Sequence, residues 1–158
     1  EQLWDHIHLF GFLHDQVAEI KQAEEAANIE KEKKMGKLHD QLKAIGYDGH
    51  ALQVILIRLL FCLFAEDTGI FAKYQFTHFI QRKTKTDGSD LAAQLSHLFH
   101  VLNQPENQRL KNLDADLAEF AYINGQLFSE FLPPASFDDE MRALLLEACE
   151  MDWSKISP

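Results

Sequence analysis

The most apolar stretch of the 158-residue chain reads Leu52-Gln-Val-Ile-Leu-Ile-Arg-Leu-Leu-Phe-Cys-Leu-Phe-Ala-Glu-Asp-Thr-Gly-Ile-Phe71. Between positions 54 and 64 every residue is apolar except Arg58. A strand of this length would be unusual, and Gly69 follows the acidic pair at the place where a helix would end. The stretch therefore predicts a helix from about Gly49 to Asp67.

A helix that is apolar on every side is expected to be surrounded by other helices. We therefore predict an all-α fold, an irregular multi-helix bundle around this central apolar helix. The apolar run is shorter than the roughly 20 residues that a membrane-spanning helix needs, so we expect no membrane partner. The chain shows no strand pattern and no internal repeat.

Five further segments carry apolar residues at helical spacing, which predicts further helices or short helices. We expect Asn28 to cap the helix before the central one, and Ser136 with Asp139 to start the last one. The positions that define these segments are Met35, Leu38, Leu42 and Ile45; Phe71, Tyr74, Phe76, Phe79 and Ile80; Leu91, Leu95, Leu98, Phe99 and Leu102; Leu110, Leu113, Leu117 and Phe120; and Phe137, Met141, Leu144, Leu145, Ala148 and Cys149. We expect the first and the last of these sets to be buried, with Trp153 covering the end of the last helix.

The N-terminal part differs in composition from the rest. Leu3 to His14 is rich in aromatic residues and is either a short helix or an irregular docking segment, and Gln16 to Ala27 is rich in Ala and Glu. We predict a connector or docking segment over residues 1–27 and one helical domain over residues 28–158. The chain lacks an initiator Met, so we expect it to be a piece of a larger protein.

The overall charge limits the classes of partner. Fifteen basic and 25 acidic residues give a formal net charge of −10. Nucleic-acid binding depends on neutralising phosphates with Lys and Arg, so we expect weak or no direct DNA binding by this segment. Cys62 and Cys149 both lie on predicted apolar faces, as reduced thiols of an intracellular protein do, and no signal peptide precedes them. We expect a cytoplasmic protein.

Candidates for chemistry are few. Glu32-Lys33-Lys34 matches half of a metal-dependent nuclease motif, but it lies on the polar face of a predicted helix. His97 and His100 have a spacing that can bind a metal, yet no Cys or carboxylate partner is near at metal-site spacing. We therefore predict no catalytic, cofactor-binding or metal-ligating residue in this segment.

Charged residues at the central helix are candidates for a structural or interdomain role instead. Arg58 must find a carboxylate or a carbonyl, because it lies within an apolar helix. Glu66 and Asp67 oppose the helix dipole at a C-terminus, which indicates a compensating partner: a basic residue, the turn at Thr68-Gly69, or a neighbouring domain. A structural lock is favoured over catalysis.

Several blocks, in order, resemble the MmeI-like (type IIL and IIG) fused restriction-modification DNA methyltransferases. The central block is Arg58 to Phe71, and Tyr122-Ile-Asn-Gly-Gln-Leu-Phe128 is similar to a turn ahead of many adenine-specific DNA methyltransferase domains. The other blocks are Lys37-Leu-His-Asp40, Gly46-Tyr-Asp-Gly-His50, Asp87-Gly-Ser-Asp90, Leu98-Phe99, Val101-Leu-Asn103, Leu144-Leu-Leu-Glu-Ala-Cys149 and Asp152-Trp-Ser-Lys-Ile-Ser-Pro158. The structural or interdomain candidates are Arg58, Glu66, Asp67, Thr68, Tyr122, Asn124 and Trp153.

The resemblance implies a non-catalytic helical spacer between an N-terminal endonuclease and an S-adenosylmethionine-dependent adenine-specific DNA methyltransferase. Those flanking domains would be its partners, and DNA would be bound through the parent protein, with S-adenosylmethionine and Mg²⁺ as the parent's cofactors. The family's cofactor glycines and its Asn-Pro-Pro-Tyr motif have no match here, so no catalytic residue is carried over. Two alternatives stay open: a stand-alone helical interaction or regulatory module, and an enzyme in its own right.

Overall fold

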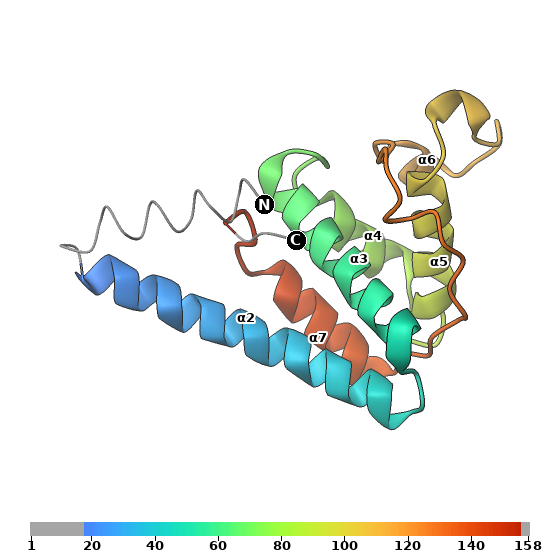
Figure 1. The fold of residues 1–158 in the computed structure, drawn as a ribbon. Helices are drawn as coiled ribbons and strands as arrows, with labels where there is room; N and C mark the ends of the chain where they lie inside the picture. Colours follow the sequence, from blue (N-terminus) through green and yellow to red (C-terminus); the bar gives the residue numbers. More distant parts are fainter. Residues whose placement is uncertain (1–17, 156–158) are drawn as a thin grey trace.

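The computed structural model describes residues 18–155, with side chains described for residues 26–155. The described part consists of helices and loops without a strand, as the all-α prediction requires (Figure 1). The helices are α2 (Ala18–Ala44), α3 (Gly49–Thr68), α4 (Gln75–Lys83), α5 (Leu91–Leu102), the 3₁₀ turn η1 (Glu106–Gln108), α6 (Ala115–Ala118) and α7 (Asp139–Cys149).

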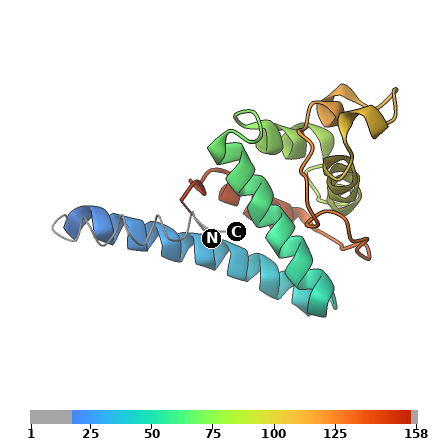
Figure 2. The same cartoon turned by 45° about the horizontal axis from the view of Figure 1, so that its top comes forward.

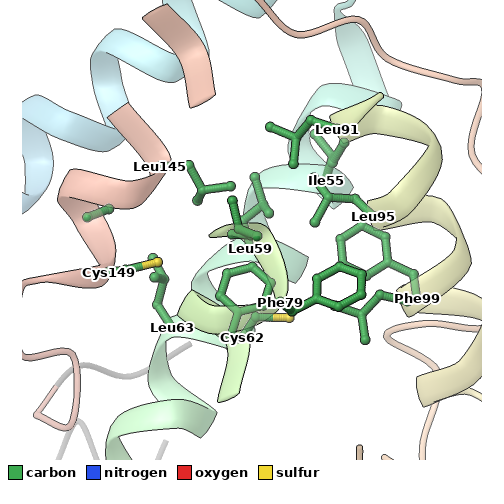
Figure 3. Packing of buried hydrophobic residues seen from close by; sticks show 14 of the residues in the cluster. Ile55, Leu59, Cys62, Leu63, Phe79, Leu91, Leu95, Phe99, Leu145 and Cys149 are labelled. Atoms are coloured by element: carbon green, nitrogen blue, oxygen red, sulfur yellow. The ribbon is translucent and has the colours of Figure 1, made fainter. Parts of the chain in front are cut away.

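The central helix predicted from about Gly49 to Asp67 is α3. It contacts α2 and α4, while α7 lies along α2 (Figures 1 and 2). Figure 3 shows Leu59 and Leu63 of α3 directed toward α7, and Ile55 directed toward α5. Leu59 is fully buried, and each such Leu contributes about 1.5–3 kcal/mol relative to an exposed one. This helix supplies much of the core.

The expectation that helices surround α3 on every side is wrong. Its buried positions follow one face, and the opposite face carries Ile57, which is 44% exposed. By length and composition α3 is also the one helix of the described part that could cross a membrane, so the length argument above does not hold. Arg58 and Glu66 are buried on it and hydrogen-bonded within the protein, which fits a core helix.

α2 is one continuous helix of 27 residues, so Asn28 does not cap a helix there. The Ala- and Glu-rich sequence before Asn28 has high helix propensity, and the helix continues through it. The boundary predicted between residues 27 and 28 falls inside α2, and the division into two segments stays a prediction. The aromatic segment Leu3 to His14 lies outside the described residues.

The predicted stripe on α2 is correct at Leu38 and Leu42, which are fully buried, and wrong at Ile45. The helix ends at Ala44, and Gly46 takes the left-handed conformation with φ 95°, so Ile45 turns away from the core. The backbone N–H of Tyr47 donates to the carbonyl of Leu42 across this turn, at 3.0 Å.

For the later helices, most of the predicted apolar positions are buried, whereas the predicted starts of the helices differ from the observed ones. The apolar positions predicted for α4, α5 and α7 are buried, as is Trp153, except Tyr74. Tyr74 lies just before α4 in the left-handed conformation, with φ 62°, and is 52% exposed. Leu110 is wrong, because α6 is only four residues long and Leu110 lies before it, 73% exposed. Asp138, not Ser136, caps α7 by accepting a hydrogen bond from the N–H of Met141.

Candidate interdomain site

Arg58 fixes the loop between α6 and α7 to the central helix. Its Nε donates to the carbonyl of Leu127 at 2.9 Å, and its Nη2 donates to the carbonyl of Glu130 at 2.6 Å. The guanidinium carbon lies 5.4 Å from the ring centre of Phe99 and 5.6 Å from that of Phe128. Burial lowers the pKa of the Arg58 guanidinium, and nearby Glu130 opposes that shift. Backbone carbonyls are therefore the main partners of this cation.

Tyr47 in the turn between α2 and α3, and His50 at the start of α3, hold the same loop. The hydroxyl of Tyr47 donates to the carbonyl of Pro133 at 2.8 Å. The Nε2 of His50 lies 2.8 Å from Oε1 of Glu130. Phe128 closes the loop onto the core, with its ring 5.8 Å from that of Phe61. The segment from 127 to 133 is thus tied at both ends to α3 and to the turn before it.

Glu66 connects the end of α3 to the beginning of α4. Its carboxylate accepts hydrogen bonds from the backbone N–H and the hydroxyl of Thr77, at 2.8 and 2.9 Å. Thr77 lies in the first turn of α4, where backbone N–H groups lack helical partners and the helix dipole favours an anion. Burial raises the pKa of the Glu66 carboxyl, and the hydrogen bonds from Thr77 partly oppose that increase.

Asp67 and Thr68 both bond to backbone within the chain. The Oδ2 of Asp67 accepts a hydrogen bond from the N–H of Trp153 at 2.8 Å, and burial raises the pKa of Asp67. The Thr68 hydroxyl donates to the carbonyl of Phe64 at 2.8 Å. Trp153 is buried, and its Nε1 donates to the carbonyl of Ala148 at 2.7 Å. Asp67 and Trp153 thereby hold the segment after α7 against the end of α3.

The Tyr-x-Asn-Gly turn is open to solvent. The Tyr122 hydroxyl donates to Oδ1 of Asn124 at 3.2 Å, and the Tyr122 side chain is 39% exposed. Gly125 takes a φ of 125°, which favours glycine. Of the two aromatic residues that flank this turn, Phe128 is buried and anchors it, whereas Tyr122 does not.

Two further buried arginines, Arg109 and Arg142, also donate hydrogen bonds to backbone carbonyls, and neither was predicted from the sequence. Arg109 donates four hydrogen bonds to backbone carbonyls, from Nε to Gln104 at 3.0 Å, from Nη1 to Ala118 at 3.0 Å and Phe120 at 2.8 Å, and from Nη2 to Val101 at 3.0 Å.

Arg142 of α7 donates from Nε to the hydroxyl of Thr84 at 2.9 Å and from Nη2 to the carbonyl of Ile80 at 3.2 Å, at the end of α4. Arg142 lies on the buried stripe of α7, which is the signal that singled out Arg58. Arg109 lies in an irregular segment and offers no such signal.

The residues considered for metal chemistry do not come together with further ligands in the described part of the chain. His97 and His100 are exposed on α5, and no group of three possible metal ligands occurs within the described residues. On α2, Glu32 is exposed and Lys34 pairs with Glu147 of α7. No residue described here is assigned to a metal or a cofactor.

The cysteine prediction is confirmed for the thiols, since Cys62 and Cys149 are both free and buried. Burial raises the pKa of the Cys149 thiol to about 12 and that of Cys62 well above its usual value.

Comparison with known proteins places this fold in a family. Residues 50–128, half of the chain, match the family model described as "MmeI, helicase spacer domain". The chain belongs to the MmeI spacer domain family. The matched region runs from His50 through α3 to Phe128, so it contains Arg58 and the carbonyl of Leu127 to which it donates.

Two similar proteins extend the comparison. DNA methyltransferase A of Bacillus subtilis (strain 168) is 38% identical over 98% of this chain. The solved structure of the type IIL restriction-modification enzyme MmeI in complex with DNA is 62% identical, with a TM-score of 0.80 over 82% of this chain. This chain spans 17% of the length of each of them. The expected resemblance to MmeI-like proteins is confirmed.

Proposed function

We propose that this spacer domain is a rigid, non-catalytic connector between an N-terminal endonuclease and an adenine-specific DNA methyltransferase. Its role would be to hold the two at a set separation, so that cutting falls at a set distance from the recognition site. The observation that carries the proposal is α2, a continuous helix that is fixed to the body at one end and extends from it at the other (Figures 1 and 2).

α2 can fix the distance between the preceding part of the polypeptide and the body of the spacer. Its 27 residues span about 40 Å at 1.5 Å per residue. In its second half Leu38 and Leu42 are buried, Lys34 pairs with Glu147, and Gln41 donates to Glu140 at 2.9 Å. Residues 26–30, by contrast, are all exposed. One half of the helix is therefore fixed to α7 and α3, and the other half leads toward the preceding part of the polypeptide.

A connector of this kind must also be stiff. Three buried arginines, Arg58, Arg109 and Arg142, hold irregular segments and helix ends to the core through backbone carbonyls. A guanidinium presents five donors in a fixed fork, so each arginine can fix several backbone groups at once. The body should therefore move as one unit when α2 moves.

The proposal assigns chemistry to the rest of the parent protein. S-adenosylmethionine would bind to the methyltransferase domain and Mg²⁺ to the nuclease, with the parent acting in the cytoplasm. DNA would be bound mainly by those domains, since the net charge of −10 opposes phosphate binding by the spacer. Sub-micromolar duplex binding by this chain at physiological salt would contradict that assignment.

The test is to lengthen α2 in the full-length polypeptide and to map the cut. Seven helix-forming residues inserted between Ala26 and Ala27 add about two turns, or about 10 Å, and nearly keep the helix face. Duplex DNA rises 3.4 Å per base pair, so we expect the cut to move by about three base pairs. Methylation of the recognition site should stay unchanged, because the insertion leaves that side of the protein intact.

A flexible insertion provides the matched control. Seven Gly and Ser residues at the same place have the same number of atoms along the backbone but no fixed length. We expect the cut positions to scatter instead of shifting as a set. An unchanged cut position with the helical insertion would overturn the proposal, because the separation would then be set elsewhere.

A further inference from the structure

Phe131 is exposed on a loop whose backbone is held in place. Its side chain is 89% exposed, the highest value among the large exposed apolar residues of the described part. On one side Arg58 donates to the carbonyl of Glu130 at 2.6 Å, and on the other Tyr47 donates to the carbonyl of Pro133 at 2.8 Å. A large aromatic residue is thus presented to solvent by a segment that the core prevents from folding inward.

A groove adjoins Phe131 and has a volume of about 430 Å³. Its walls come from α3, from Phe99 and His100 of α5, and from Leu132 and Pro133 of the loop itself. Aromatic residues beside a preformed apolar groove are typical of the centres of protein interfaces. Because the ties to Arg58 and Tyr47 fix the loop in advance, little conformational entropy remains to be lost on binding.

The occupant lies in the same polypeptide. This chain spans 17% of its two relatives, one of which is a DNA methyltransferase, so most of such a polypeptide lies outside the spacer. We take the methyltransferase domain as the occupant because it is the activity that the name of one relative gives. A domain that binds DNA carries a basic surface, which the net charge of −10 of this chain complements. Glu130, next to Phe131, offers a carboxylate to a basic rim.

We propose that Phe131 inserts into an apolar, basic-rimmed pocket of the methyltransferase domain of the same polypeptide. An apolar side chain of that domain would enter the groove beside Phe131 in return. This inference rests on the proposed connector function and adds to it, since it names the surface that keeps the methyltransferase from rotating about the end of the spacer. Both ends of the described chain lie on the other side of the molecule from this loop, so the contact would give a second, separate attachment (Figures 1 and 2).

The test is photo-crosslinking in the full-length polypeptide. Phe131 is replaced by p-benzoylphenylalanine, and the crosslinked peptides are identified by mass spectrometry. We expect an intramolecular crosslink to a peptide of the methyltransferase domain. The matched control places the same photoreactive residue at Leu110, which is 73% exposed and does not line the groove beside Phe131, and should give little crosslinking to that domain.

Amide hydrogen exchange tests the same contact without the photoreactive residue. In full-length protein, Phe131→Ala should raise the amide exchange rate of residues 129–132 by about tenfold, as expected when an interface anchor is lost. Leu110→Ala should leave it unchanged. Crosslinks to the nuclease domain, to a second copy or to nothing, or unchanged exchange in Phe131→Ala, would overturn the inference. The cut-position experiment is independent, since the spacer could set that distance without this contact.

Discussion

Two regions of this spacer domain bury apolar side chains but satisfy their backbone groups in different ways. The α2, α3 and α7 region packs through long apolar stripes, with Leu38, Leu59 and Leu145 at 1% exposure or less. The segment from 103 to 137 contains only η1 and the four-residue α6, and it depends on Arg58 and Arg109 for its position. The first region is built mainly by hydrophobic burial between helices. The second buries apolar anchors such as Phe120 and Phe128, and in addition needs hydrogen bonds from arginines to its backbone carbonyls.

The difference follows from how each segment satisfies its backbone. A long helix pairs its own N–H and C=O groups, so only its apolar face needs a partner. An irregular segment leaves carbonyls unpaired, and burying them without a donor would be costly. Arg109 alone donates to four carbonyls, those of Gln104 and Phe120 in the irregular segment and those of Val101 and Ala118 at the ends of α5 and α6, which holds a segment with little helix against the core.

The largest expected loss in the free energy of unfolding comes from a substitution in the α2, α3 and α7 region. Leu59→Asp places an unpaired carboxylate at a position with no solvent exposure and should cost about 4 kcal/mol or more, enough to leave the chain unfolded. Ile57→Asp, on the exposed face of the same helix, should cost about 1 kcal/mol or less. Urea unfolding followed by circular dichroism measures both. Equal losses from the two substitutions would show that the buried face of α3 is misassigned.

A smaller and more local effect is expected in the arginine-held region. Arg109→Met removes four hydrogen bonds and leaves buried carbonyls unpaired, which should cost about 3 kcal/mol. Amide exchange should rise first between residues 103 and 120, while α2 and α7 stay protected. Arg82→Met, at an exposed position of α4, is the control. Uniform loss of protection across the whole chain would contradict the proposed division into two regions.

The smallest effect tests the junction between α3 and α4. Burial raises the pKa of Glu66 in the folded chain, so its contribution to stability is greatest below the unfolded pKa and is lost as pH rises through the folded pKa. Gln does not titrate. The free energy of unfolding of Glu66→Gln minus that of the wild type should therefore increase from pH 4 to pH 7. Glu32→Gln, at an exposed position of α2, is the control for the substitution itself. A decrease with pH would mean that the bonds from Thr77 outweigh the burial.

The sequence predicted the parts of the fold that have long periodic patterns. Leu91, Leu95 and Leu98 identified α5, and the apolar run around Arg58 identified α3 within one residue of its observed end. It failed at Leu110, where three-residue spacing continues but the chain does not form a helix. It also failed at Ile45, where a glycine turn changes the direction of the last side chain. Local spacing carries no information about such turns.

The candidate residues show the same limit. Arg58 stood out because a cation within an apolar run must have a partner, but its partners Leu127 and Glu130 lie 69 and 72 residues away. Glu66 stood out because it opposes the dipole of its own helix, while the compensating N–H belongs to α4. Arg109 gave no signal, since the carbonyls it binds come together only in the folded chain.

The amino-acid sequence by itself determined the helical class, the apolar helix at the centre, the buried thiols and the MmeI-like family, because helical periodicity and short motifs are local properties. Only the tertiary structure decided which carbonyls each arginine holds, which face of α3 stays open, and that Phe131 is presented beside a groove. Those features depend on contacts between segments tens of residues apart, which form when burial brings them together and which no local pattern encodes.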